Sequence, residues 1–144
     1  MGIGNPLRGD DALGIELIKL LRNRVSRNVL LIEGGPVPEN FIGKIKIFAP
    51  SHVLLIDAAC FGGNPGDASL ISPEQITGVI ISTHAIPLHL TAELIREVTG
   101  AKIMLLGIQP KNVDLGEKIS PEVKDSIKRI AGIIVEILNK TLKP

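Results

Sequence analysis

Residues 53–57, Val-Leu-Leu-Ile-Asp, form a continuous apolar run that ends in a carboxylate. Two similar runs occupy residues 28–32 (Asn-Val-Leu-Leu-Ile) and 103–108 (Ile-Met-Leu-Leu-Gly-Ile), and glycine, proline or charged residues bound all three. Short runs of this kind are typical of strands that are buried on both faces of a parallel sheet. They predict the central strands of such a sheet.

The segments between these runs have the spacing of amphipathic helices. Leucines recur from residue 13 to residue 21, and apolar residues recur at helical spacing from residue 88 to residue 98 after Pro87. The clearest pattern follows Ser120, which is placed as an N-cap before Pro121, and it continues through Val123, Ile127, Ile130, Ile134 and Leu138. Ser72 and Gln75 have the spacing of a capping box. The alternation predicts a three-layer α/β/α sandwich around a mostly parallel, twisted sheet, with residues 66–72 as an edge strand.

Composition excludes several classes of protein. The length of 144 residues, with 44% hydrophobic and 22% charged residues, predicts one domain over residues 1–144. A net charge of +1 and only three aromatic residues disfavour nucleic-acid binding. The single cysteine, Cys60, excludes an intrachain disulfide and suits a reducing compartment. No apolar stretch approaches the roughly 20 residues that span a bilayer, so we expect a cytoplasmic protein without membrane insertion.

Polar residues follow several of the predicted strands, and this placement indicates a functional site. Ligands of parallel α/β folds bind outside the carboxyl ends of the strands, so segments 2–11, 33–40 and 57–66 and the residues around His84 should share one rim. Asp57 ends an apolar strand, where a buried carboxylate costs free energy unless it is paired, hydrogen-bonded or metal-bound. The alternatives are structural: Asp57 would bind backbone amides of the next loop, and His84 would cap or pack a helix.

The opening loop, Gly2 to Asp11, is rich in glycine but lacks a third glycine for dinucleotides and the Gly-Lys-Ser/Thr of a P-loop. One aspartate of the pair Asp10 and Asp11 would serve as a helix cap, and two exceed that need. Asp11, Asp57 and His84 together are the right types for a mixed oxygen and nitrogen metal site, and imidazole favours a transition metal. A thiol nucleophile at Cys60 is the weaker interpretation, because no electropositive setting is apparent around it.

The chain also resembles a known family, the [NiFe]-hydrogenase maturation endopeptidases, and within it the branch that serves hydrogenase 3 of the formate-hydrogenlyase type. The resemblance covers nearly the whole chain in the order of the family's motifs, and it implies a phosphorylase/hydrolase-like fold. These motifs are Gly2-x-Gly4-Asn5-x-Leu7-x-x-Asp10-Asp11-x-x-Gly14, Gly34-Gly35-x-x-Pro38-Glu39-Asn40, Leu55-Ile56-Asp57-Ala58, Asn64-Pro65-Gly66, Thr83-His84-x-x-Pro87-Leu88 and Leu106-Gly107-Ile108-Gln109-Pro110.

The resemblance implies an aspartyl-type endopeptidase that removes the C-terminal extension of a [NiFe]-hydrogenase large-subunit precursor after nickel insertion. Asp11, Asp57 and His84 would be its catalytic and metal-binding residues, and the precursor would supply the nickel, with no organic cofactor. Glu33, Gly34 and Gly35 would bind substrate, although the family usually has Asp in the place of Glu33. Asp57 is the best-placed general base, and the metal either polarises the scissile carbonyl or only anchors the substrate.

Two other functions are compatible with the residues. A non-catalytic, nickel-dependent maturation chaperone would bind the same precursor without cleaving it. A nucleotide-binding enzyme is the weaker alternative, and a nucleotide that raises the melting temperature would indicate it.

The first strand is expected to be truncated. In the resembling family an apolar strand precedes the Gly-x-Gly-Asn loop, whereas here only Met1 precedes Gly2. Loss of about five buried strand residues would forfeit roughly 1.5 to 3 kcal/mol for each large apolar side chain. We therefore expect that the natural polypeptide starts upstream. Without those residues, segments 28–32 and 53–56 should pair directly or borrow a strand from another copy of the chain, and the loop that holds Asp11 should be displaced or mobile.

Overall fold

The computed structural model describes residues 1–78, 80–81 and 87–142. Its strands are β1 (Gly2–Ile3), β2 (Glu33–Gly35), β3 (His52–Cys60), β4 (Ala68–Ile71), β5 (Ile80–Ile81) and β6 (Lys102–Ile108). Its helices are α1 (Leu13–Leu21), α2 (Ile42–Phe48), α3 (Leu88–Thr99) and α4 (Pro121–Thr141), joined by short 3-10 helices η1 (Gly9–Ala12), η2 (Pro38–Phe41) and η3 (Pro73–Gly78).

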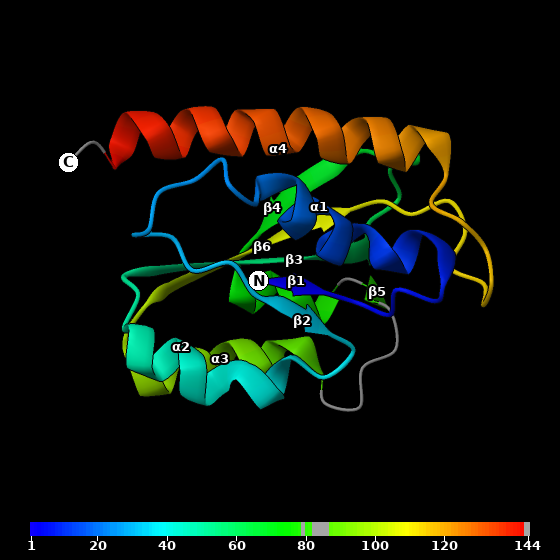
Figure 1. Cartoon of the computed structure of the whole chain (residues 1–144). Coiled ribbons are helices and arrows are strands. Elements are labelled where there is room, and N and C mark those ends of the chain that lie inside the picture. The colour runs from blue at the N-terminus through cyan, green and yellow to red at the C-terminus, as the bar shows by residue number, and fades with distance from the viewer. Residues whose placement is uncertain (79, 82–86, 143–144) are drawn as a thin grey trace.

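The sheet runs in the order β2-β1-β3-β6-β4, and its first four strands are parallel. Strand β4 is the antiparallel edge strand expected within residues 66–72, and β5 pairs antiparallel with the end of β3. Helices α1 and α4 cover one face of the sheet and α2 and α3 the other (Figure 1). The predicted three-layer α/β/α sandwich is therefore confirmed.

The core consists of two apolar clusters, one on each face of the sheet. Successive residues of β3 alternate between them, with Leu55 packing on the side of α3 and Ile56 on the side of α1 and α4. Both side chains are buried, as are Leu105 and Leu106 at the corresponding positions of β6. The continuous apolar runs at residues 53–56 and 103–108 thus mark strands with two covered faces.

Two local predictions need correction. Residues 28–32 do not form a strand, and pairing with β1 begins at Glu33, which lies opposite Gly2. The reason is that a parallel ladder needs a neighbour, and β1 extends no further toward the beginning of the chain. Ser120 occupies the N-cap position of α4, but its hydroxyl makes no capping bond and binds Asp10 instead. One half of the predicted capping box is present, since the Gln75 side chain accepts a hydrogen bond from the Ser72 amide, while the Ser72 hydroxyl donates to the same side chain.

Strand β1 is only two residues long, and it lies between β2 and β3. The expectation that segments 28–32 and 53–56 pair directly is therefore wrong. An apolar cavity of about 440 Å³ lies next to Met1, between these two segments and the C-terminal end of α4. Its lining includes Leu30, Val53 and Leu138. The Met1 α-amino group donates a hydrogen bond to the Leu54 carbonyl at 2.8 Å, and burial lowers the pKa of this amine to about 5.

Among the described residues, no helix has the length and apolar character needed to cross a membrane.

Candidate functional site

Two glycines allow the opening loop to pack directly on the sheet. Gly4 has a φ of +130°, and a Cβ there would lie 1.9 Å from the carbonyl oxygen of Asp11. A Cβ on Gly14 would lie 2.4 Å from the carbonyl oxygen of Ile56. Glycine is therefore needed at both positions, because the backbone of Gly4 approaches that of Asp11 and the backbone of Gly14 approaches that of Ile56. This contact places the N-terminal end of α1, and η1 before it, against β3.

Asp11 lies in η1 and is 3% exposed. One of its carboxylate oxygens, Oδ2, accepts a hydrogen bond from the Asn5 amide at 2.8 Å. The Gly4 amide in turn donates to the Gly35 carbonyl at 3.0 Å, which ties the loop to β2. The expected displacement of the loop that holds Asp11 is thus not observed.

Asp57 is fully buried and lies within β3 rather than at its end, because the strand continues to Cys60. It is paired in register with Gly107 of β6, and its Oδ1 accepts a hydrogen bond from the Ala58 amide at 2.8 Å. Since η1 contacts β3, the elements that carry Asp11 and Asp57 meet at the carboxyl-end side of the sheet. Two buried carboxylates on contacting elements are a costly arrangement in a stable core, and such pairs are characteristic of functional sites.

The third predicted ligand, His84, lies outside the described residues. The chain enters the undescribed segment 82–86 from Ile81, which pairs with Ala59, two residues after Asp57. Within residues 1–78, 80–81 and 87–142, no group of three metal-ligating side chains occurs.

Glu33, Gly34 and Gly35 form β2, beside the opening loop. The Glu33 carboxylate forms an ion pair with Arg22, the residue that follows the C-terminal end of α1. Asp11 precedes the N-terminal end of the same helix, so the structure does not bring Glu33 and Asp11 together. Gly35 has a φ of +63°, and its carbonyl accepts the hydrogen bond from the Gly4 amide of the opening loop.

Gln109 has a structural role that the sequence indicated only through the Gly-Ile-Gln-Pro motif. Its Oε1 accepts hydrogen bonds from the amides of Phe61 at 2.9 Å and Gly63 at 3.2 Å. It therefore holds the loop that follows β3. Cys60 is the last residue of β3 and precedes that loop, and its thiol is exposed and free.

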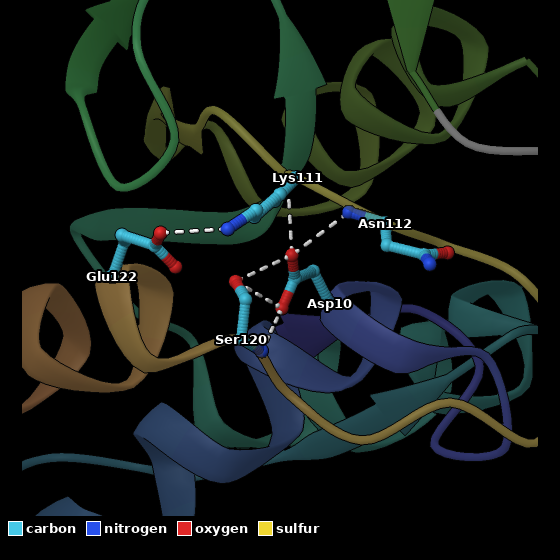
Figure 2. Close-up of polar contacts among 5 residues, drawn as sticks. All are labelled: Asp10, Lys111, Asn112, Ser120 and Glu122. Atoms are coloured by element: carbon cyan, nitrogen blue, oxygen red, sulfur yellow. Dashed lines mark hydrogen bonds and ion pairs between the residues drawn. The ribbon is translucent and has the colours of Figure 1, made fainter.

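Asp10, the neighbour of Asp11, binds the segment between β6 and α4. Figure 2 shows its carboxylate among backbone and hydroxyl groups of Lys111, Asn112 and Ser120. An exposed ion pair between Lys111 and Glu122 lies beside this network, and the hydrogen bond from Lys111 lowers the pKa of the Glu122 carboxyl below its ordinary value. The prediction that one of the paired aspartates caps α1 is therefore wrong: the N-cap residue is Ala12, and Asp10 binds a segment more than 100 residues away in the chain.

Comparisons with known proteins agree with the motifs. The profile of a family described as "Hydrogenase maturation protease" matches residues 15–137. A putative hydrogenase maturation protease of Methanocaldococcus jannaschii is 36% identical over 148 residues, covering 97% of this chain and 87% of the relative. The hydrogenase 3 maturation protease of Escherichia coli K12 is 32% identical over 129 residues, covering 89% and 82%. The crystal structure of a [NiFe] hydrogenase maturation protease from Thermococcus kodakarensis superposes with a TM-score of 0.88 at 40% identity, covering 96% of this chain and 89% of that one. The chain therefore belongs to the hydrogenase maturation protease family.

Proposed function

We propose that the protein is the endopeptidase that removes the C-terminal extension of a [NiFe]-hydrogenase large-subunit precursor after nickel has been inserted. The observation that carries this proposal is the pair of buried carboxylates, Asp11 and Asp57, on contacting elements of a chain that belongs to the maturation protease family. The partner is the precursor, and processing takes place in the cytoplasm.

The proposed chemistry assigns a role to each of three side chains. Asp11, Asp57 and His84 offer oxygen and nitrogen donors to the nickel ion that the precursor brings as part of the substrate. The donor set fits, because two carboxylates and one imidazole leave coordination positions for the thiolates of the precursor. Recognition of the metallated precursor and positioning of its scissile bond would then occur at one site.

Asp57 acts as the general base in this proposal. Its carboxylate accepts a proton from a water molecule as the water oxygen attacks the scissile carbonyl carbon, and the proton is then passed to the leaving amine. The Ala58 amide donates to Oδ1 of this carboxylate at 2.8 Å and thereby fixes its orientation within β3.

The test uses the pure protein, the nickel-loaded precursor and the same precursor without nickel. Mass spectrometry should show that the loaded precursor loses the mass of its extension and that the nickel-free precursor does not. Asp57→Asn and His84→Ala should each lower the rate by more than about tenfold, as expected for groups that take part in proton transfer or metal contact. Asp125→Asn, an exposed carboxylate of α4, is the matched control and should process at the parental rate.

The outcomes distinguish a protease from a non-catalytic chaperone. Stable binding of the loaded precursor without any loss of mass would contradict the protease and indicate a chaperone. Parental rates in folded Asp57→Asn would remove the general base from the mechanism. Cleavage of the nickel-free precursor at the same rate would refute the dependence on nickel.

A further inference from the structure

Asp10 is a buried charged group that the proposed chemistry does not use. It is 0% exposed, and its oxygens accept hydrogen bonds from the amides of Lys111 (2.8 Å), Asn112 (3.1 Å) and Ser120 (2.7 Å). The Ser120 hydroxyl lies 2.8 and 3.0 Å from the two oxygens (Figure 2). Hydrogen bonds from neutral donors to a carboxylate are among the stronger ones in proteins, so this contact is firmly held.

The carboxylate joins both ends of one segment. Lys111 and Asn112 stand where the chain leaves β6, and Ser120 stands where it enters α4. The backbone adds further contacts from the same turn, since the Asp10 amide donates to the Asn112 carbonyl at 2.8 Å and the Gly9 amide to the Glu117 carbonyl at 3.2 Å. Segment 111–120 therefore packs on the opening loop, and most of the hydrogen bonds between them involve Asp10.

The same turn determines where Asp11 lies. The Asp11 amide donates to the Arg8 carbonyl at 3.0 Å, and the Arg8 side chain donates through Nε to the Val113 carbonyl at 3.2 Å. The Asp11 carboxylate is held in turn by the Asn5 amide. Movement of segment 111–120 would thus release residues 8–10, which directly precede Asp11.

We infer that Asp10 is a positioning residue, whose buried carboxylate locks segment 111–120 onto the turn of residues 5–11 and thereby holds the Asp11 carboxylate in place. The catalytic consequence rests on the proposed function, while the geometric one does not. Asp10→Asn is a near-isosteric test. Whichever way the new amide turns, its NH₂ group faces at least one backbone N–H that then lacks an acceptor.

The Asn5 amide reports directly on Asp11, because its acceptor is the Asp11 carboxylate. Hydrogen exchange of this amide, measured by NMR in the free protein, should be about tenfold faster or more in Asp10→Asn, together with the amides of Lys111, Asn112 and Ser120. Glu122→Gln removes only the exposed ion pair with Lys111 and is the matched control, with Asn5 exchange within about twofold of the parent. If Asn5 exchange in folded Asp10→Asn also stays within about twofold, Asp10 holds only the segment and the inference is refuted.

A second variant keeps the test decisive if Asp10→Asn does not fold. Ser120→Ala removes the hydroxyl contacts and keeps the buried charge and three backbone donors, so Asn5 exchange should rise by a smaller factor, about threefold. Unchanged exchange of the Asn5 amide in Ser120→Ala would refute the inference that Asp10 positions Asp11.

Cleavage of the nickel-loaded precursor measures the catalytic consequence. Asp10→Asn should lower kcat by about tenfold or more with KM within about threefold, because a misplaced Asp11 impairs the reaction rather than the overall binding surface. A parental kcat would refute a role in catalysis even if Asn5 exchange rises. If the parent protein itself fails to cleave, the proposed function fails, and the exchange of Asn5 still decides whether Asp10 positions Asp11.

Discussion

Replacement of Gly14 by alanine tests how α1 is seated on the sheet. Gly14 is the second residue of α1, and a Cβ there would lie 2.4 Å from the Ile56 carbonyl oxygen and 2.7 and 2.8 Å from the carbonyl oxygen and amide nitrogen of Ile3. All three obstacles are backbone atoms of β3 and β1, so no side chain can rotate away. Helix α1 would have to withdraw by about 1 Å to reach an ordinary contact distance.

The energetic cost follows from this withdrawal. Leu13 and Leu17 of α1 are fully buried against the sheet, and a close-packed interior loses contact energy when such a helix retreats. Overpacking typically costs about 1 to 3 kcal/mol, and immovable backbone favours the upper value. The higher helix propensity of alanine returns about 1 kcal/mol or less, leaving a net loss of roughly 2 kcal/mol. For a chain of this size, that loss lowers the melting temperature by about 4 to 8 °C.

Thermal unfolding monitored by circular dichroism measures this loss. Gly132→Ala is the matched control, because a Cβ on Gly132, within α4, meets nothing within 4 Å. It should raise the melting temperature by about 2 °C through helix propensity alone. An unchanged or raised melting temperature in Gly14→Ala would refute the argument that backbone contact seats α1. Processing of the precursor should also slow, because Asp11 lies just before the displaced end of α1.

Two further predictions concern single chemical groups. Cys60→Ser should keep most of the peptidase activity, because the thiol is exposed at the end of β3 and the proposed chemistry does not use it; loss of activity in this variant, together with inactivation of the parent by iodoacetamide, would point to a cysteine peptidase. In a polypeptide that starts at Met1, the buried amine has a pKa of about 5 when folded and an ordinary value near 8 when unfolded. The unfolded state then binds more protons between pH 8 and pH 5, so stability is complete above pH 8 and falls by about 4 kcal/mol toward pH 5. Urea midpoints across this range measure the loss, which an N-acetylated form should largely lack; identical pH dependence in both forms would exclude the amine as its source.

The sequence by itself determined the layers of this protein and indicated the residues of its candidate site. Apolar runs at residues 53–56 and 103–108 report burial on both faces, and a period of three to four residues after Pro121 reports one covered face of a helix. Both patterns can be recognised within a short stretch of sequence. The backbone geometry of a helix or a strand sets which residues face the core, and buried positions are occupied by apolar side chains. The same logic placed Asp11 and Asp57 on one rim of the sheet, and the elements that carry them, η1 and β3, are in contact, although Asp57 lies within β3 rather than at its end.

Contacts between distant residues were decided only by the tertiary structure. Ser120 has the sequence of a cap, yet its hydroxyl binds Asp10, which is 110 positions away. Residues 28–32 have the composition of a strand, yet they lack a neighbour to pair with, and Glu33 binds Arg22 instead of lying beside Asp11. Local patterns carry the preferences of each segment, whereas the partner of a hydrogen bond or an ion pair is settled by which segments the packed sheet brings together.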